Sequence, residues 1–178
     1  MQRVTPALAD TIVRSGRIGP TPVGDTERRN IATALERIAT GSTYPLTVAG
    51  ICELHRDLTH SAVVDQLLPG EPMIPGRLRT RDTLGGIAAR DLPRELQTAL
   101  DTIRAMPPLE AARAAHWTVS LAIPFADANG RTARLLGISL LAPHHDGDVV
   151  TADEALRPHW EMTRDPVRRA AMLVAANH

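Results

Sequence analysis

The stretch Ile123–Arg134, which reads IPFADANGRTAR, lies between two apolar segments with helical patterning, residues 109–121 and 132–141. Asn129 and Gly130 both tolerate the left-handed backbone that turns successive N–H groups toward one point, where they can bind an anion. The following helix adds its own unpaired N–H groups and the positive end of its dipole. The stretch therefore predicts a loop that holds a negatively charged group at the start of a helix.

The side chains of this loop suit the same ligand. Arg131 and Arg134 are three residues apart, so both can lie on one face of the first helical turn and donate to phosphate oxygens. Asp127 is the acidic residue of the loop, and a carboxylate beside bound phosphates is a common ligand for Mg²⁺. Phe125, the only phenylalanine of the chain, is expected to anchor the loop in the core. A plain helix–helix connection with solvated arginines is the alternative.

These residues resemble the signature of the Fic/Doc family, His-x-Phe-x-(Asp/Glu)-(Gly/Ala)-Asn-(Gly/Lys)-Arg-x-x-Arg. The first position departs from it, because Ile123 stands where the family has histidine. The resemblance extends over residues 50–142 and includes the helix around His55 and the segment 76–86, which is similar to the family's flap over its target. Seven signature positions match: Phe125, Asp127, Ala128, Asn129, Gly130, Arg131 and Arg134.

The resemblance implies an all-α, Fic-like helical bundle with a short β-hairpin-like flap over residues 72–87. It implies that Asp127 holds Mg²⁺ accompanying a nucleotide such as ATP, and that Phe125 is a structural anchor. Family members commonly transfer AMP, or another phosphate-linked group, to a hydroxyl of a protein target. Nucleotide phosphates would contact Asn129, Gly130, Arg131 and Arg134, and the substrate would contact the flap at Gly76, Arg77, Leu78 and Arg79.

Ile123 removes the family's general base, because its side chain cannot accept a proton. A positioned general base contributes roughly 10²–10⁴-fold, or about 3–5 kcal/mol of barrier. We therefore expect nucleotidyl or phosphoryl transfer to hydroxyls to be weak, absent or rerouted, while a nucleotide or phosphorylated small molecule still binds. The catalytic residue is left unassigned.

Three functions stay open. The chain is a Fic-type transferase with rerouted chemistry, a catalytically inactive regulator that binds a nucleotide or a partner, or a biosynthetic enzyme that reuses the anion pocket for a phosphorylated or carboxylated small molecule. The retained Asp127 and the two arginines favour an anionic ligand over a pure scaffold. The segment Asp25–Asn30 approximates the family's inhibitory motif, (Ser/Thr)-x-x-x-Glu-(Gly/Asn), with altered spacing.

The amino-acid composition excludes several classes of fold and function. Apolar residues make up 43% of the 178 residues and aromatic residues only 2%, which predicts one domain with an aliphatic core. Twenty basic residues balance twenty acidic ones, so nucleic-acid binding is not expected. Every basic residue is arginine, which excludes a lysine nucleophile and a P-loop lysine. The absence of long apolar runs and of a signal-peptide core predicts a cytoplasmic protein without membrane contact.

The chain divides into an N-terminal arm, residues 1–24, and a Fic-like helical domain, residues 25–178. Helices are expected over residues 26–40, 47–58, 60–68, 92–105, in a short segment from residue 151 or 153, and over 165–176. The cluster from His144 to Asp148 is interpreted as a solvated turn in preference to a metal site. His116 lies two turns from Ile123, about 10 Å along a helix, and is expected to be a hydrogen-bonded, half-buried histidine.

Overall fold

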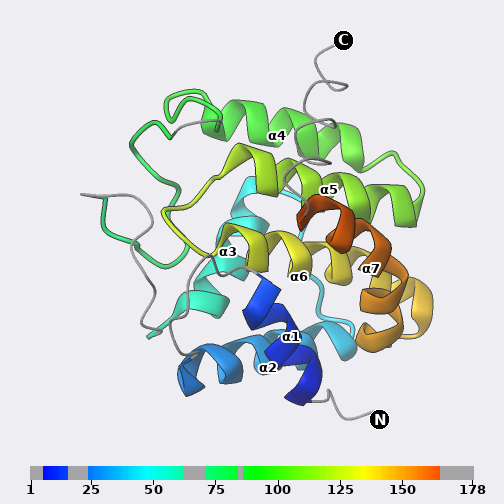
Figure 1. Cartoon of the computed structure of the whole chain (residues 1–178). Coiled ribbons are helices and arrows are strands. Elements are labelled where there is room, and N and C mark those ends of the chain that lie inside the picture. The colour runs from blue at the N-terminus through cyan, green and yellow to red at the C-terminus, as the bar shows by residue number, and fades with distance from the viewer. Residues whose placement is uncertain (1–5, 16–23, 62–70, 84–85, 165–178) are drawn as a thin grey trace.

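The structure, a computed structural model, describes residues 6–15, 24–61, 71–83 and 86–164. Within these ranges it is entirely helical, with no strand, which confirms the predicted all-α class (Figure 1). The elements are α1 (Pro6–Ser15), α2 (Asp25–Ala39), α3 (Val48–Thr59), α4 (Leu92–Ile103), α5 (Pro108–Ala122), α6 (Asn129–Leu141), the 3₁₀ helix η1 (Ala142–His145) and α7 (Val149–Arg164).

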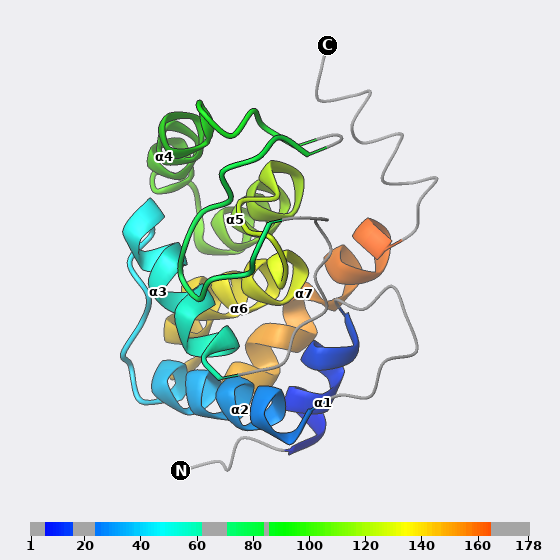
Figure 2. The ribbon, with the colours of Figure 1, turned by 90° about the vertical axis from the view of Figure 1, so that its left-hand side faces the viewer.

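Helix α6 forms the centre of the molecule. In two perpendicular views α5 runs beside it, α3 lies on one side, α7 on another, and α1 and α2 lie below (Figures 1 and 2). Ten of its residues are buried, among them Leu135, Leu136 and Ile138. Gly137 allows the close approach of α5 and α7, since an added Cβ would lie 2.9 Å from the Trp160 ring and 3.2 Å from the Ala112 carbonyl oxygen. The helix that carries the signature is therefore enclosed by its neighbours.

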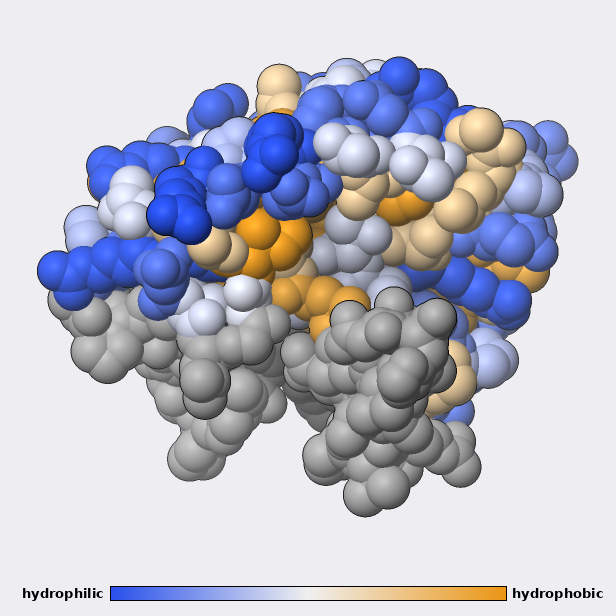
Figure 3. Space-filling view, turned by 90° about the horizontal axis from the view of Figure 1, so that it is seen from above, coloured by the Kyte–Doolittle hydropathy of each residue, from blue (hydrophilic) through white to orange (hydrophobic). Residues whose placement is uncertain are grey.

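The core is aliphatic, as the composition predicts. In α4 the buried residues Leu92, Leu96, Leu100 and Ile103 recur at helical spacing, and Pro93 lies in the first turn, where its missing N–H has no intrahelical partner to lose. Seen from above, polar residues cover much of the surface and apolar residues gather near the middle of the face (Figure 3). No helix of the described segments is long and apolar enough to cross a bilayer.

Part of the expected N-terminal arm is a packed helix. Leu8, Ile12 and Val13 of α1 are buried, and α1 contacts both α2 and α6. The flanking prolines, glycines and threonines dominate the composition of this segment and hide a short apolar stripe at helical spacing. The boundary of the arm at residue 24 stays a prediction.

The C-terminal part contains a longer helix than expected. Asp148 starts α7 by accepting hydrogen bonds from the backbone N–H groups of Val150 and Thr151 and from the Thr151 hydroxyl, as an N-cap residue does. The helix then continues through Pro158 to Arg164, so the short helix predicted here is too short. The helices predicted over residues 60–68 and 165–176 lie outside the described residues, apart from the first two positions of the former.

The flap is extended, but its described residues form no strand pair. The Glu71 carboxylate accepts hydrogen bonds from the backbone N–H groups of Thr80 and Arg81, so a side chain takes donors that a hairpin ladder would use. A turn at Gly76, with φ of +74°, places the flap against α3. The segment predicted as the flap thus packs on α3, and its described residues show no hairpin pairing.

Candidate functional site

The signature loop joins α5 to α6 through two left-handed residues. Ile123 has φ 46° and ψ 60°, and Ala128 has φ 61° and ψ 12°. Between them the Asn129 side chain closes the loop, because its Oδ1 accepts from the Phe125 N–H at 2.9 Å and its Nδ2 donates to the Phe125 carbonyl at 2.8 Å. Left-handed backbone is costly for residues with a Cβ, so the tertiary contacts of the loop must sustain this shape.

Phe125 lies under the loop in the core. Its side chain is fully buried and stacks on the His55 ring, with centroids 3.8 Å apart and an interplanar angle of 7°. The imidazole of His55, which α3 supplies, is also fully buried. The anchor role of Phe125 stays a prediction, and this burial supports it.

His55 contacts both the flap and the loop. Its Nδ1 accepts a hydrogen bond from the Gly76 backbone N–H at 2.9 Å, and its Nε2 lies 3.2 Å from the Asp127 carbonyl oxygen. Burial lowers the pKa of His55 to about 4, so the ring is neutral at neutral pH. From sequence, His55 belongs only to the family resemblance, and no role is predicted for it.

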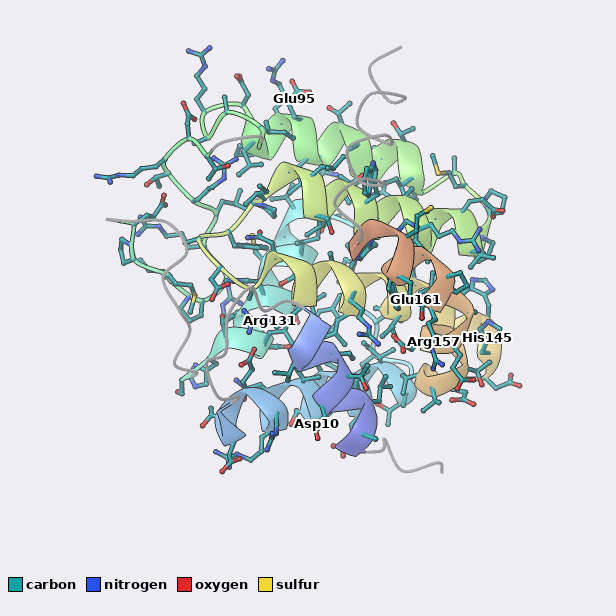
Figure 4. The ribbon with its side chains drawn as sticks, in the orientation of Figure 1. Asp10, Glu95, Arg131, His145, Arg157 and Glu161 are labelled. Carbon is teal, nitrogen blue, oxygen red and sulfur yellow. The ribbon has the colours of Figure 1, made fainter. Side chains whose placement is uncertain are left out.

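The first signature arginine is held by two carboxylates of its own chain. Arg131 forms ion pairs with Glu27 of α2 and with Asp127 Oδ1, the latter at 3.2 Å. Asp127 Oδ1 also accepts the Ala128 N–H, and all three charged side chains are buried. Figure 4 shows Arg131 in the interior of the molecule, while the other labelled side chains lie nearer the periphery. The positive charge of Arg131 is therefore neutralised by carboxylates of the same chain.

The second signature arginine has a different internal partner. Arg134 forms a bidentate pair with Asp153 of α7, with Nε–Oδ1 and Nη2–Oδ2 distances of 2.8 Å. Its Nη1 donates to the Thr11 carbonyl of α1 at 3.2 Å, and Trp160 Nε1 donates to Asp153 Oδ1 at 3.0 Å. The exposed fractions of Arg134 and Asp153 are 5% and 3%. The sequence predicts that the two arginines lie on one face of α6 and bind the same ligand. In the structure they form ion pairs with different helices, α2 and α7.

The carboxylates of Glu27 and Asp153 are partners that the sequence does not predict. Glu27 lies in the segment noted as similar to the inhibitory motif, and the structure places it against Arg131. Asp153 was considered only as a helix start. Glu27 is 104 residues away from Arg131, and no local pattern indicates such a long-range pair.

Arg79 of the flap is a structural residue in this conformation. Its guanidinium donates to the carbonyl oxygens of Ala122 at 3.2 Å and Arg81 at 2.7 Å, and also to those of Ile123 and Ile87. Carbonyls at the end of a helix lack intrahelical donors, so the buried Arg79 caps α5, and burial lowers its pKa. Its donors are thus directed inward, in contrast to the substrate contact expected from sequence.

The other predicted flap residues lie nearer the surface. Arg77 is exposed, and Leu78 and Gly76 are half-buried. The backbone N–H of Arg79 donates to the Pro124 carbonyl at 2.9 Å, so the flap is hydrogen-bonded directly to the signature loop. A contact between this flap and a substrate stays a prediction.

The histidines outside the loop form no recognised metal centre. His116 is buried rather than half-buried, and its Nδ1 lies 3.0 Å from Nε2 of His159 on α7. His144 is exposed within η1, and Asp146 is exposed directly after it. Within the described ranges, no group of three or more His, Cys, Asp or Glu side chains is arranged to hold a metal ion.

The matched region of the chain includes the loop, α3 and the flap. A family model described as Fic/DOC family matches residues 45–141. The chain belongs to the Fic/DOC family. Over 102 residues it is 31% identical to a Caenorhabditis briggsae protein named protein adenylyltransferase fic-1, a match that covers 52% of this chain and 18% of that protein.

Solved structures support the Fic fold. A Fic family protein from Desulfovibrio desulfuricans G20 superposes with a TM-score of 0.63 at 18% identity, covering 98% of this chain and 53% of that one. An E274G variant of Fic-1 from C. elegans gives a TM-score of 0.50 at 22% identity, covering 87% and 55%. This Fic chain therefore spans about half the length of these solved relatives and a smaller part of the curated one.

Proposed function

We propose that this chain is a catalytically inactive Fic-family protein whose signature loop binds nucleotide phosphates only when its own carboxylates are displaced. The observation that carries this proposal is the buried pairing of both signature arginines, Arg131 with Glu27 and Arg134 with Asp153. The two pairs occupy the guanidinium groups that phosphate oxygens would otherwise contact.

Ile123, at the position of the family's general base, has no group that accepts a proton. The Asp127 carboxylate of the loop is engaged by Arg131 and by the Ala128 N–H. His55 lies against the loop, but its two ring nitrogens face the Gly76 N–H and the Asp127 carbonyl. His116 Nδ1 faces His159. Neither of these two imidazoles is placed to take a proton from an incoming hydroxyl.

The loop retains backbone N–H groups and a carboxylate that would bind a nucleotide with its metal ion. The first N–H groups of α6, at Asn129 and Gly130, lie at the half-exposed start of a helix whose dipole favours an anion. Asp127 is the carboxylate that would hold a Mg²⁺ ion arriving with the phosphates, a mode in which Mg²⁺ needs only one or two protein carboxylates. Bound there, the ion would supply neutralisation of the phosphate charge.

The buried ion pairs of Arg131 and Arg134 determine how tightly the loop would bind a nucleotide. Removing one partner of a buried ion pair leaves an uncompensated charge and costs roughly 3–5 kcal/mol. A phosphate can replace the displaced carboxylate as the partner of the arginine, but the carboxylate must then find a new environment. We therefore expect weak nucleotide binding by the parent chain and tighter binding when the competing carboxylate charge is removed.

Isothermal titration with ATP, GTP, ADP and AMP, with and without Mg²⁺, tests this proposal. Asp153→Asn keeps an oxygen to accept the Trp160 N–H but removes the charge, and Glu27→Gln does the same for Arg131. We expect each variant to bind ATP at least about tenfold more tightly than the parent, equivalent to about 1.4 kcal/mol. The control Glu154→Gln, at an exposed position of α7, should match the parent.

Two outcomes would count against the proposal. Tight ATP binding by the parent, unaltered by either substitution, would show that the ion pairs do not compete with the ligand. If the parent and the variants are folded and none of them binds a nucleotide, the loop does not bind the proposed ligand and the proposal is wrong.

The loss of the base is tested by Ile123→His in the Asp153→Asn background. If this variant labels protein with radioactive ATP and the Ile123 parent does not, the remaining signature residues are competent. Labelling by the unaltered chain would refute inactivity.

A further inference from the structure

His55 is the one imidazole described here that joins the flap to the signature loop. Its ring stacks on Phe125, its Nδ1 faces the Gly76 N–H at 2.9 Å, and its Nε2 faces the Asp127 carbonyl at 3.2 Å. The bonded groups lie 21 and 72 residues away in sequence. One fully buried side chain of α3 therefore touches two segments that come from different parts of the chain.

The partners determine the tautomer of the ring. The Gly76 backbone N–H can only donate, so Nδ1 must be unprotonated to accept it. The Asp127 carbonyl can only accept, so Nε2 must carry the proton. The arrangement requires the neutral Nε2–H tautomer, and each nitrogen serves a different segment.

The turn at Gly76 is seated closely on α3. A Cβ at Gly76 would lie 2.8 Å from the Cys52 carbonyl oxygen and 3.0 Å from Cβ of Arg56, and its φ of +74° is unfavourable for other residues. The opposite side of the flap is fixed by Arg79, which donates to the Ile123 carbonyl. The flap is thus attached at two points, at Gly76 to α3 and at Arg79 to the start of the signature loop.

We propose that His55 is the positioning residue that couples the flap to the anion loop, with Nδ1 holding the Gly76 turn and Nε2–H holding the Asp127 carbonyl. Asp127 directly precedes the left-handed Ala128, from which the first N–H groups of α6 take their direction. A displacement of the loop at Asp127 is therefore transmitted to the Gly76 turn through the His55 ring, beside the direct bonds that Arg79 makes to Ile123 and Pro124. The coupling rests on the proposed function only for the identity of the ligand at the loop, because the two hydrogen bonds need none.

Three substitutions separate the two bonds. His55→Asn places an acceptor near the position of Nδ1, His55→Gln places a donor near the position of Nε2, and His55→Phe keeps only the stack on Phe125. Amide hydrogen exchange in the full-length chain reports each contact, at the Gly76 N–H for the flap and at the Phe125 N–H for the loop. The control is His144→Asn, at an exposed site.

We expect His55→Asn to protect Gly76 and to speed exchange at Phe125 by about tenfold, the effect of losing roughly one net hydrogen bond. His55→Gln should give the reverse, His55→Phe should speed both, and His144→Asn neither. Equal exchange at both reporters in all three His55 variants would overturn the coupling and leave His55 as a core ring.

The tautomer gives a second measurement that needs no substitution. In the parent chain labelled with ¹⁵N-histidine, the proposal requires a protonated Nε2 and an unprotonated Nδ1. A ring protonated at Nδ1 would overturn it even if the variants failed to fold. Neither measurement contains a nucleotide, so failure of ATP binding and failure of the coupling are distinguishable.

Discussion

Ile123 combines a β-branched side chain with a left-handed backbone, φ 46° and ψ 60°, a pairing that sterics disfavour strongly. Histidine tolerates this conformation better than isoleucine does. The residue that the family signature has at this position therefore suits the backbone of the loop, and isoleucine retains the loop shape at an energetic cost.

Replacing Ile123 with a residue that accepts this backbone should stabilise the fold. We expect Ile123→Asn or Ile123→Gly to raise the free energy of unfolding by about 1 kcal/mol, because the left-handed penalty is about 1–2 kcal/mol per residue. Ile123→Val, which keeps the β-branch, should give no gain. Urea denaturation of the three variants provides the measurement, and a loss of stability in both Asn and Gly variants would contradict the strain argument.

The Arg134–Asp153 pair should behave as a buried unit. Arg134→Ala and Asp153→Ala should each cost roughly 3–5 kcal/mol, since each leaves a buried charge uncompensated. The double variant should cost much less than the sum, and a double-mutant cycle from chemical denaturation gives the coupling.

Arg157→Ala is the matched control for this cycle. Its side chain is 57% exposed and lies 3.6 Å from Glu154, and a surface pair of this kind contributes about 0–1 kcal/mol. Strict additivity of Arg134→Ala and Asp153→Ala would show that the buried pair is not a unit.

At the scale of elements, the packing of α5, α6 and α7 decides where the site residues lie. Gly137 faces Trp160 of α7 and the Ala112 carbonyl of α5, so α6 approaches both helices closely. The same α7 supplies Asp153 to Arg134. The spacing between these helices thus determines whether the buried ion pair can form.

Gly137→Ala tests this spacing. Alanine favours a helix by about 1 kcal/mol over glycine, but its Cβ would meet the Trp160 ring at 2.9 Å, and overpacking costs about 1–3 kcal/mol. We expect a net loss of stability and weakened Arg134–Asp153 pairing. Gly24→Ala, where nothing lies within 4 Å of the new Cβ, is the control, and thermal unfolding compares the two. A gain of stability for Gly137→Ala would show that the helices adjust freely.

At the scale of the whole molecule, two buried histidines make stability depend on pH. Burial lowers the pKa of His55 and of His159 to about 4, from 6.5 in the unfolded chain. Between these values the unfolded state binds more protons, so stability falls as the pH drops from 6.5 toward 4. For the fully buried His55 ring this gap corresponds to about 3 kcal/mol.

Urea midpoints measured from pH 7 to pH 4 check this dependence. Glu71 and Asp148 have lowered pKa values, and their contribution is lost at lower pH than that of the histidines. His159→Gln should flatten the profile between pH 6.5 and 4, and the exposed His144→Gln should leave it unchanged. A profile that is flat in this window for the parent chain would contradict neutral burial.

Much of the fold could be predicted from sequence, because helices are encoded locally. The apolar spacing of α2, α3, α4 and α5 placed them within a few residues, and the signature identified the family. The partners of Arg131 and Arg134 could not be predicted, because Glu27 and Asp153 join them only through the tertiary fold. Helix α1 was missed because its apolar stripe is short and lies within a segment rich in proline and glycine.

The contact between α1 and Arg134 has a consequence for protein engineering. The carbonyl oxygen of Thr11 accepts a hydrogen bond from Arg134, so the first described helix contacts the last residue of the signature. A fused domain or surface-immobilisation handle placed directly before α1 would pull on that helix and disturb the arginine without altering any residue of the loop. If the loop binds ATP as proposed, sensors that immobilise the chain by this side would report an affinity that depends on the attachment.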